Sequence, residues 1–245
     1  MYYFFCHTAR LGPHLRQRER VEPPAQAFPT PALRKEREGR GTHYVADAGE
    51  IKSLGTRRFA PPTTDSRHGW RIWPNLARGL VTRNLNELWV ADITYVRLQE
   101  EFAYVAVVLD AHSRRVIGWA VAGHLGASLA VEALRMALSE RQPAPGLIHH
   151  SDRGIQYACA DYLTLLAEHG AQPSMSRVGN PYDNAKAESF MKTLKEEQVR
   201  HHQWRDLNAL RADLSRFLQI TYNHQRLHSS LDYQTPAAFE QQFSS

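Results

Sequence analysis

The stretch LWVADITYVRL at residues 88–98 decides the architecture of this chain. β-branched and aromatic residues surround a single acid, Asp92, and this pattern predicts a strand that carries a carboxylate near its middle. Residues 102–109 form an almost continuous apolar run, as expected of a central strand, and residues 115–121 follow as a third strand after a short turn. The folded core therefore begins near Glu87 with three strands joined by hairpins.

Helices and strands then alternate along the core. Four elements follow in the order helix, strand, helix, strand, at residues 129–138, 146–150, 162–168 and 173–176. A later helix over residues 207–222 has an apolar stripe at helical spacing. Together these elements predict an α/β fold with a mixed five-stranded sheet flanked by helices. We expect the strands at residues 88–98 and 146–150 to be neighbours in this sheet.

Three carboxylates on separate elements form the candidate site. Asp92 lies within the first strand and Asp152 directly follows the fourth, so adjacent strands would bring both acids to one edge. Glu188 lies on a helix that we expect to begin at Asn184, with Asp183 as its N-cap. Oxygen ligands of this kind suit Mg²⁺, and two such ions can drive an in-line phosphoryl displacement. Taken singly, each acid has a simpler interpretation as a strand, turn or solvated helix residue, and Asp183 is a rival ligand.

Basic and polar residues around this helix are candidates for contact with DNA. Glu188, Lys192 and Lys195 are spaced at i, i+4 and i+7, so they share one helix face. A solvated surface is the simpler alternative for both lysines. Further candidates for contact with phosphate or bases are Arg177, Asn180, Asn184 and, in the tail, Arg226. Most such contacts position DNA and carry no sequence information. The tail itself either folds toward DNA or anchors the last helix, and the sequence leaves both roles open.

Other residues near the acids have simpler structural interpretations. His149 and His150 precede the second acid, where an imidazole could orient water or accept a proton. Packing and local hydrogen bonding are the commoner roles for such residues. Cys159 is interpreted as a small buried residue, and Trp89 and Tyr95 as core residues that do not stack on bases.

Composition bounds the class of protein. The chain has 245 residues, an apolar fraction of 42% and a formal charge of +5, which allow one catalytic domain with extensions and favour a nucleic-acid partner. Residues 51–90 hold seven Lys or Arg against two Asp or Glu. The two cysteines, Cys6 and Cys159, form no CxxC unit, which disfavours a zinc site or a disulfide framework and fits a reducing cytoplasm. The apolar runs are too short to cross a membrane.

The sequence of residues 1–50 lacks the pattern expected of a folded unit. Five prolines and the charged run RKERE at residues 34–38 interrupt any long apolar periodicity in residues 1–50. The sequence therefore predicts a poorly structured or frame-shifted extension at residues 1–50, a basic linker at 51–86 and a catalytic core with C-terminal helices at 87–245.

Five sequence frames carry a resemblance to a known family. They are residues 58–68, 89–96, 149–157, 179–190 and 222–231. Residues 51–243 resemble the catalytic, second-frame protein of the insertion-sequence-three family of bacterial transposases and, more distantly, the retroviral integrase core. The resemblance implies that Asp92, Asp152 and Glu188 form a DDE triad on a ribonuclease-H-like fold.

The resemblance also implies a chemistry and a set of partners. The triad would hold two Mg²⁺ ions, with Mn²⁺ able to substitute, and would catalyse DNA strand cleavage and strand transfer at the ends of an insertion sequence. Lys195 would grip the element's end. The expected partners are DNA, as terminal repeats and target, further copies of the chain, and a helix-turn-helix protein from an upstream frame. The expected location is the cytoplasm, at the nucleoid and away from membranes.

Two other functions are compatible with the sequence. One is a truncated remnant that binds DNA without transposing, because the helical DNA-binding region that family members carry upstream of the core is not visible in residues 1–50. A shifted reading frame or a start within a damaged copy would explain this, and a helical DNA-binding segment at 1–50 would contradict it. The other is a ribonuclease-H-like nuclease, which would cleave without preference for terminal repeats.

Overall fold

Five strands form one mixed sheet in a computed structural model of the chain, which describes residues 69–177 and 181–243. In chain order they are β1 (Leu88–Arg97), β2 (Phe102–Asp110), β3 (Val116–Ala122), β4 (Ile148–Ser151) and β5 (Gln172–Met175). Their spatial order is β3-β2-β1-β4-β5. Strand β2 pairs antiparallel with both β1 and β3. Strand β4 pairs parallel with both β1 and β5. Each predicted strand is confirmed with ends shifted by at most two residues, and so is the adjacency of the first and fourth strands.

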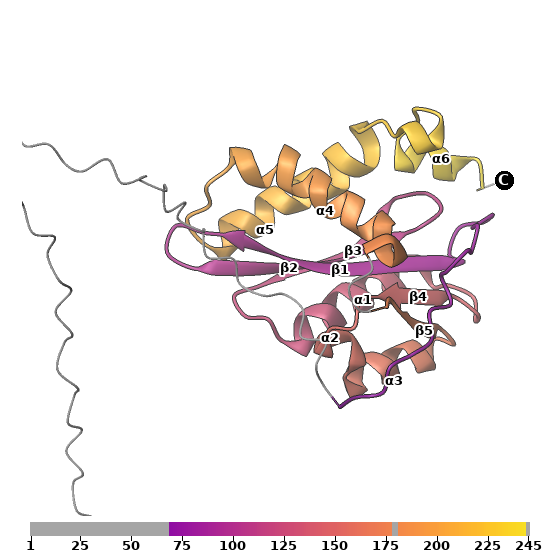
Figure 1. Cartoon of the computed structure of the whole chain (residues 1–245). Coiled ribbons are helices and arrows are strands. Elements are labelled where there is room, and N and C mark those ends of the chain that lie inside the picture. Colours follow the sequence, from indigo (N-terminus) through magenta and orange to yellow (C-terminus); the bar gives the residue numbers. More distant parts are fainter. Residues whose placement is uncertain (1–68, 178–180, 244–245) are drawn as a thin grey trace, which may run out of the picture. The chain divides into compact units, whose positions relative to one another are not determined.

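Helices cover both faces of the sheet (Figure 1). One face carries α1 (Ala127–Arg141), α2 (Ile155–Ala158) and α3 (Ala160–Glu168), and the other carries α4 (Ala185–Glu197), α5 (Leu207–Arg216) and α6 (Pro236–Gln241). The helices predicted at residues 129–138 and 162–168 are confirmed. The helix predicted over 207–222 is confirmed as helical, but its second half belongs to a π-helix (Phe217–Gln225) that directly follows α5 (Leu207–Arg216). Such wide turns often occur where a helix must present a particular side chain.

Alternation along β1 sends successive side chains to two different cores. Trp89 and Ile93 belong to the apolar cluster that α1 and α3 cover. Leu88 and Val90 belong to the cluster that α4 and α5 cover. Successive strand residues point to opposite faces, so Asp92 shares the face of Leu88 and Val90 and points to the α4 side. The burial of both faces also explains why the central strands are almost continuously apolar.

A buried amide ties the C-terminal segment to the edge strand β3. Asn223, on the π-helix, accepts a hydrogen bond from the backbone N–H of Val116 (3.0 Å) and donates one to its carbonyl oxygen (2.9 Å). The amide thereby pairs with the free edge of β3 much as a neighbouring strand would. The tail therefore anchors the last helix, which is one of the two roles that the sequence left open.

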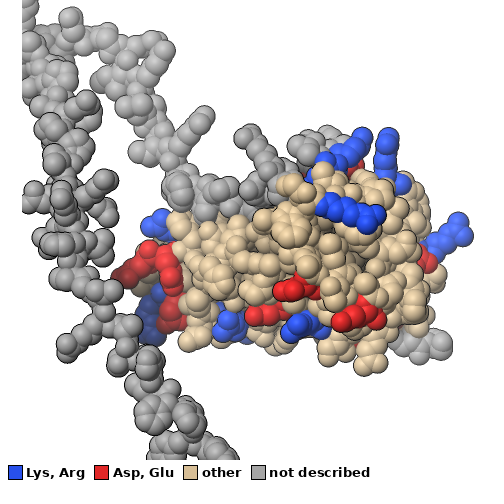
Figure 2. Space-filling view, turned by 90° about the horizontal axis from the view of Figure 1, so that it is seen from below, with Lys and Arg blue, Asp and Glu red and all other residues tan. Residues whose placement is uncertain are grey.

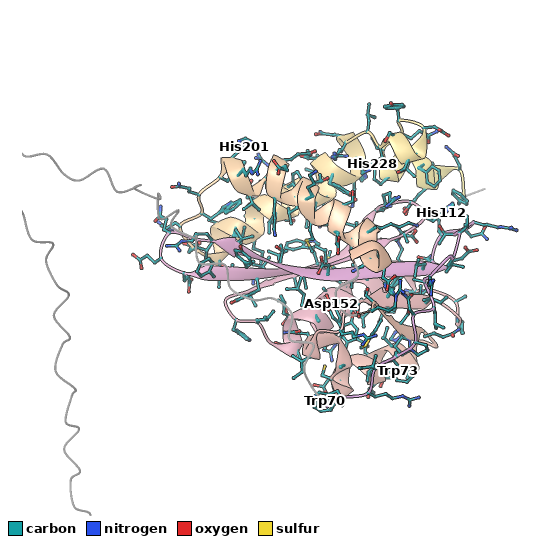
Figure 3. The ribbon with its side chains drawn as sticks, viewed as in Figure 1. Trp70, Trp73, His112, Asp152, His201 and His228 are labelled. Atoms are coloured by element: carbon teal, nitrogen blue, oxygen red, sulfur yellow. The ribbon has the colours of Figure 1, made fainter. Side chains whose placement is uncertain are left out.

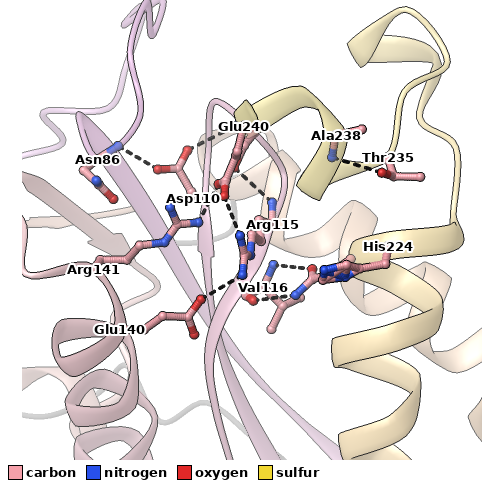
Figure 4. Close-up of polar contacts among 12 residues, drawn as sticks. Asn86, Asp110, Arg115, Val116, Glu140, Arg141, His224, Thr235, Ala238 and Glu240 are labelled. Atoms are coloured by element: carbon pink, nitrogen blue, oxygen red, sulfur yellow. Dashed lines mark hydrogen bonds and ion pairs between the residues drawn. The ribbon is translucent and has the colours of Figure 1, made fainter. Parts of the chain in front are cut away.

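Glu240 on α6 makes a second tie between the tail and the sheet (Figure 4). This buried carboxylate accepts hydrogen bonds from the guanidinium of Arg115 (2.8 Å), the hydroxyl of Ser113 (2.6 Å) and the guanidinium of Arg141. A buried carboxylate is tolerated only when charged or hydrogen-bonding partners replace water. The cluster therefore fixes α6 against the β2–β3 turn and the end of α1.

Residues 69–86 pack on the catalytic core, although the sequence assigned them to a linker. Trp73 contacts the cluster under α1 and α3 (Figure 3), Ala77 contacts the cluster under α4 and α5, and the N–H of Leu76 donates to the hydroxyl of Ser174 (2.8 Å). The chain divides into two units, Met1–Arg57 and Arg58–Ser245. The predictions for residues 1–50 and for the first part of the linker, 51–68, lie outside the described residues.

The face covered by α1 to α3 shows no excess of either charge. Figure 2 views this side and shows Lys and Arg interspersed with Asp and Glu, while neutral residues cover most of the surface. A surface of mixed charge does not attract a polyanion such as DNA. No helix within residues 69–177 and 181–243 is long and apolar enough to cross a membrane.

Candidate active site

Asp92 lies in the middle of β1, and the parallel pairing of β1 with β4 brings Asp152 toward it. Val90 is paired with His150 across these strands, and the two acids lie two residues further along their respective chains. Figure 3 shows Asp152 beside the sheet, just past the end of β4. Asp92 accepts a hydrogen bond from the N–H of Ile93 (2.8 Å), which orients its carboxylate.

A tight turn after β4 fixes the carboxylate of Asp152. One of its oxygens accepts a hydrogen bond from the N–H of Gly154 (2.8 Å), immediately before α2 begins. A Cβ atom at position 154 would lie 3.0 Å from this oxygen and 2.8 Å from the side-chain oxygen of Gln156. Only glycine fits here without displacing those groups. Gly154 therefore allows the close approach in which its N–H orients the carboxylate of Asp152.

Asn184 ties the start of α4 to β1 and so brings Glu188 to the same side of the sheet. Its amide nitrogen donates to the carbonyl oxygen of Ala91 (3.0 Å), next to Asp92. The side chain of Asn184 is buried. The structure thus gives it a positioning role, and the prediction that it contacts DNA is not supported by its burial. Glu188 is exposed, one helical turn further along α4.

Asp183 is not the N-cap that the sequence predicted. Residues Pro181–Asn184 form a 3-10 turn and α4 begins at Ala185. Asp183 instead accepts hydrogen bonds from the backbone and guanidinium of Arg177 (2.9 to 3.1 Å), which hold the pKa of its carboxyl well below the usual range. A bidentate arginine pair competes strongly with a cap. Arg177, predicted to contact DNA, is therefore engaged by the protein itself.

The charges of Asp152 and Glu188 both act on the carboxyl of Asp92. Burial and then the charge on Asp152 raise the pKa of Asp92 to about 7, and Glu188 adds a smaller contribution in the same direction. The hydrogen bond from Ile93 and the charge of Lys195 lower it. Nearby like charges disfavour ionisation, so all four charged groups share one electrostatic environment. Burial also raises the pKa of Glu188.

The chemistry of this donor set fits a divalent cation. Three carboxylates supply the hard oxygen ligands that Mg²⁺ prefers, and a bound cation would relieve the repulsion that raises the pKa of Asp92. In the arrangement shown, no three acidic, imidazole or thiol groups of the described residues are gathered closely enough to hold one ion. The residues therefore fit the ion in chemistry, and a rearrangement is needed to fit it in distance.

A cavity of about 620 Å³ opens beside Asp92 and Glu188. Lys192 and Lys195 line it together with Glu188, which confirms that the three share one face of α4. The ammonium group of Lys195 lies 5.4 Å from the ring centroid of Tyr95, a separation at which a cation is attracted to an aromatic face. The cavity therefore combines carboxylates at one end with cations that could hold phosphates.

The other residues that line this cavity include Tyr95, Arg97 and Arg200. Tyr95 is only half-buried, so its assignment to the core is wrong. Tyr95 and Arg97 share one face of β1 by strand alternation. Arg200 continues the stripe of Lys192 two helical turns further along the chain. Alternation places Tyr95 and Arg97 on the face of β1 opposite to that of Asp92, so the periodicity of the strand did not assign them to this cavity, whereas helical spacing from Lys192 could have pointed to Arg200.

The two histidines before the second acid have structural roles. His149 lies 3.1 Å from the hydroxyl of Tyr162, and the two ring nitrogens of His150 lie 2.8 and 3.0 Å from the hydroxyls of Ser174 and Ser176. Burial lowers the pKa of His149 to about 3 and that of His150 to about 4. Both rings are therefore neutral near physiological pH, and the local interpretation is confirmed.

Of the remaining predicted residues, those that the structure describes do not line the cavity beside Asp92 and Glu188. Trp89 is fully buried, as predicted. Cys159 is half-buried and its thiol donates to the carbonyl oxygen of Gln156 (3.2 Å), so it is less enclosed than predicted. Arg226 pairs with Glu197 (2.8 Å) and lines a different cavity. Asn180 lies outside the described residues.

The variant Asp92→Asn should change how stability depends on pH in the metal-free protein. Because the pKa of Asp92 is raised from 3.8 to about 7, its contribution to stability is fully present below pH 3.8 and is lost as pH rises through 7. The amide removes this loss, so the variant should gain about 1 to 2 kcal/mol over the parent at high pH, after discounting for partial exposure.

Urea unfolding in the presence of a chelator, at acidic and at alkaline pH, measures this difference. Asp161→Asn, at an exposed acid on α3, is the matched control and should show no such trend. The buried histidines give stability the opposite pH dependence, because their contribution to the free energy of unfolding is lost as pH falls. The comparison of variant with parent removes that effect. A stability difference that is the same at both pH values would contradict the raised pKa.

Comparison with known proteins places this geometry in a family. The family description "Integrase core domain" matches residues 83–181, and a second description of the same name matches residues 169–236. The matched segments together contain all three acids.

Three curated relatives come from insertion elements. The uncharacterized 31 kDa protein of element IS600 from Shigella sonnei is 40% identical over 182 residues, which are 74% of this chain and 67% of that protein. The transposase of IS904 from Lactococcus lactis is 39% identical over 63% of this chain and 61% of its own length. Transposase InsF of IS3fB from Escherichia coli is 37% identical over 78% of this chain and 67% of its own length.

A solved structure supports the fold. The simian T-cell lymphotropic virus intasome, in complex with a PP2A regulatory subunit, contains a chain that matches with a TM-score of 0.52 and 19% identity, covering 72% of this chain and 60% of that one. The ribonuclease-H-like arrangement expected from the resemblance is confirmed. The chain therefore belongs to the insertion-sequence-three family of DDE transposases, polynucleotidyl transferases built on an integrase catalytic core.

Proposed function

We propose that Asp92, Asp152 and Glu188 are the catalytic residues with which this transposase cuts a DNA strand at the end of its insertion sequence and joins the freed 3′-hydroxyl to a new phosphate. The observation that carries the proposal is the convergence of the three charges, which raises the pKa of Asp92 to about 7 beside a cavity lined by lysines. Membership of the family implies DNA binding, assembly into multimers and dependence on a divalent metal ion.

The three carboxylates would hold two divalent cations, Mg²⁺ with Mn²⁺ able to replace it. When bound, such ions activate a water or 3′-hydroxyl and stabilise the leaving 3′-oxygen of an in-line displacement. Asp92 lies within β1 and Asp152 directly follows β4, so the pairing of these strands sets the position of the site. Glu188 is exposed on α4, and its flexible side chain is the member that moves to complete the set.

Direct attack on the phosphate also agrees with the other side chains near the acids. The pKa values of Tyr157 and Tyr162 are raised well above 10 by burial, so neither phenol is a ready nucleophile. Cys159 donates its thiol hydrogen to a backbone carbonyl. No covalent enzyme intermediate is needed when water and then a DNA 3′-hydroxyl act as nucleophiles.

Lys192 and Lys195 position the DNA backbone along α4. Both side chains are exposed and line the cavity that contains Asp92 and Glu188. The expected partners are the terminal repeats, the target DNA and further copies of this chain, together with a helix-turn-helix protein from an upstream frame. The chain would act on these in the cytoplasm, at the nucleoid.

Lys195→Ala should weaken binding to the element's end and lower the salt dependence of that binding. Removing one phosphate contact reduces the slope of log K against log salt by about one unit. Fluorescence anisotropy with labelled end DNA over a range of salt concentrations measures both quantities. Arg205→Ala, which removes an exposed arginine just before α5, is the control. A slope equal to that of the parent would exclude Lys195 from phosphate contact.

The proposed function is tested by incubating the protein with Mg²⁺ and oligonucleotides that end in the element's own terminal repeat. We expect cleavage at the 3′ end of the repeat, followed by joined products, and little reaction on a scrambled repeat. Cleavage of both substrates alike would instead indicate a ribonuclease-H-like nuclease. Binding without cleavage would indicate a transposition-defective remnant. The family match favours neither alternative.

A further inference from the structure

A second polar cavity, of about 460 Å³, lies against a different stripe of α4 from the one that carries Glu188. Its wall is formed by residues of α4, by the end of the π-helix and by the loop that leads to α6. Three cations line it, Arg114, Lys186 and Arg226, and none of its described lining residues is an Asp or Glu. We name this cavity the Arg114 pocket.

Arg114 enters the pocket without a counter-ion. Its backbone has a φ of 64°, in the left-handed region that residues other than glycine rarely adopt, and its N–H closes the β2–β3 turn onto the carbonyl of Asp110 (2.9 Å). No hydrogen bond or ion pair joins the half-buried guanidinium to any of the described residues, and burial lowers its pKa. A strained backbone that holds a half-buried, unmatched cation is a common feature of ligand sites.

The other cations of the pocket are only partly compensated. Lys186 donates to the carbonyl oxygen of Ala111 (2.9 Å), which carries no full charge, and burial and the charge of Arg114 lower its pKa. The charge of Asp110 raises the pKa of Lys186. Arg226 is paired with Glu197 (2.8 Å). Arg114 therefore remains the unmatched charge.

Neutral donors complete the lining of the pocket. The Nε2 atom of His228 is buried and has no hydrogen-bond partner among the described residues, and Figure 3 places this histidine in the helical layer that contains α4. Burial, with the charges of Arg226 and Arg114, lowers the pKa of His228 to about 4, so the ring is neutral and can donate one hydrogen. Hydroxyl groups of Ser189 and Ser229 also line the cavity. The combination of cations and hydroxyl donors suits the oxygens of a tetrahedral anion.

We propose that the Arg114 pocket binds a backbone phosphate of the DNA on which this transposase acts. Ser189 in the pocket and Glu188 in the catalytic cavity are consecutive exposed residues of α4, and Lys192 lies one turn further on the same ridge. A strand that lies on this ridge would be contacted on both sides, by Lys192 and Lys195 on one and by Arg114 on the other. The inference rests on the proposed function, because that function supplies DNA as the source of the phosphate.

The test measures DNA binding in the presence of a chelator, so that catalysis does not contribute. The parent, Arg114→Gln, Arg114→Lys and Arg135→Gln are titrated with duplex DNA at several salt concentrations. Arg135 is exposed on α1, on the opposite face of the sheet, and its variant loses the same charge. We expect Arg114→Gln to bind about tenfold more weakly and to lower the salt slope by about 0.9. Arg114→Lys should keep the slope, and Arg135→Gln should match the parent.

A second arm uses inorganic phosphate alone, at constant ionic strength, and follows thermal unfolding. Phosphate should raise the unfolding temperature of the parent and leave that of Arg114→Gln unchanged. Protection by phosphate with an unchanged DNA slope would overturn DNA as the source and assign the pocket to a small free anion. No effect of Arg114→Gln in either arm would overturn the site altogether. Removal of an unmatched charge should not impair folding. Where Arg114→Gln unfolds, Lys186→Gln, which removes another cation of the pocket, should lower the salt slope in its place, and an unchanged slope would overturn the site.

These outcomes are independent of the catalytic proposal. If the protein fails to cleave but its DNA binding shows the Arg114-dependent salt slope, the phosphate site stands and the catalytic proposal fails. If the protein cleaves at terminal repeats but Arg114→Gln leaves the salt slope unchanged, the catalytic proposal stands and the phosphate site fails.

Discussion

Asp152→Asn should abolish metal-dependent cleavage while leaving DNA binding largely intact. The substitution removes one charge from the carboxylate set and keeps the shape of the side chain, so the hydrogen bond from the N–H of Gly154 to the side-chain oxygen (2.8 Å) can persist. Metal-assisted charge stabilisation is worth several kcal/mol in the transition state, and each 1.36 kcal/mol is tenfold in rate. We therefore expect a loss of at least about a thousandfold in the rate of cleavage.

The cleavage rate on end DNA and the dissociation constant for the same DNA are measured side by side. DNA binding should change little, because the cations on α4, Lys192 and Lys195, are untouched. Asp161→Asn makes the same chemical change at an exposed position of α3 and should cleave like the parent. Cleavage by Asp152→Asn at the parent's rate would remove Asp152 from the catalytic set.

Glu240→Gln should cost the largest share of stability of any single substitution considered for this chain. The buried carboxylate is matched by the guanidinium groups of Arg115 and Arg141 and by the hydroxyl of Ser113. Removing its charge leaves Arg141 without an ion-pair partner among the described residues and leaves Arg115 with Glu140 alone, and breaking a buried ion pair in this way costs about 3 kcal/mol.

Chemical unfolding of Glu240→Gln against the parent measures this cost. Glu196→Gln is the matched control, since Glu196 forms an exposed i,i+4 pair with Arg200 on the same side of the sheet. A pair of this type contributes about 0.5 kcal/mol or less. Equal small losses in both variants would show that the buried cluster does not anchor α6.

The positions of the strands and of Asp92 and Asp152 could be predicted from local sequence. Both depend on one rule, that successive side chains of a strand point to opposite faces of the sheet. The apolar residues on either side of Asp92 must fill two cores, so its own direction is fixed once the strand is recognised. The position of Asp152 follows from the same strand pairing. Glu188, Lys192 and Lys195 could be predicted to share a face because helical spacing is equally local.

Features that depend on partners distant in the chain could not be predicted in the same way. Asp183 has the local signature of an N-cap, but Arg177 competes for its carboxylate and wins. The second half of the predicted helix is a π-helix that carries Asn223, and the partner of Asn223, Val116, lies more than a hundred residues away.

The Arg114 pocket illustrates the same limit. It draws Arg114 from a turn between strands, Lys186 from α4 and Arg226 from the tail, and no periodicity links these three positions. The sequence identified Arg226 as a candidate DNA contact but gave no reason to connect it with Arg114. Only the fold brings these cations together.

The central claim is that Asp92, Asp152 and Glu188 act as one divalent-metal site. The most direct measurement is a titration of the protein with Mn²⁺, followed by electron paramagnetic resonance, for the parent, Asp92→Asn, Asp152→Asn, Glu188→Gln and the control Asp161→Asn. We expect the parent and the control to bind Mn²⁺ alike and each of the three triad variants to bind it far more weakly. Parent-like binding by any one of the three triad variants would contradict this claim.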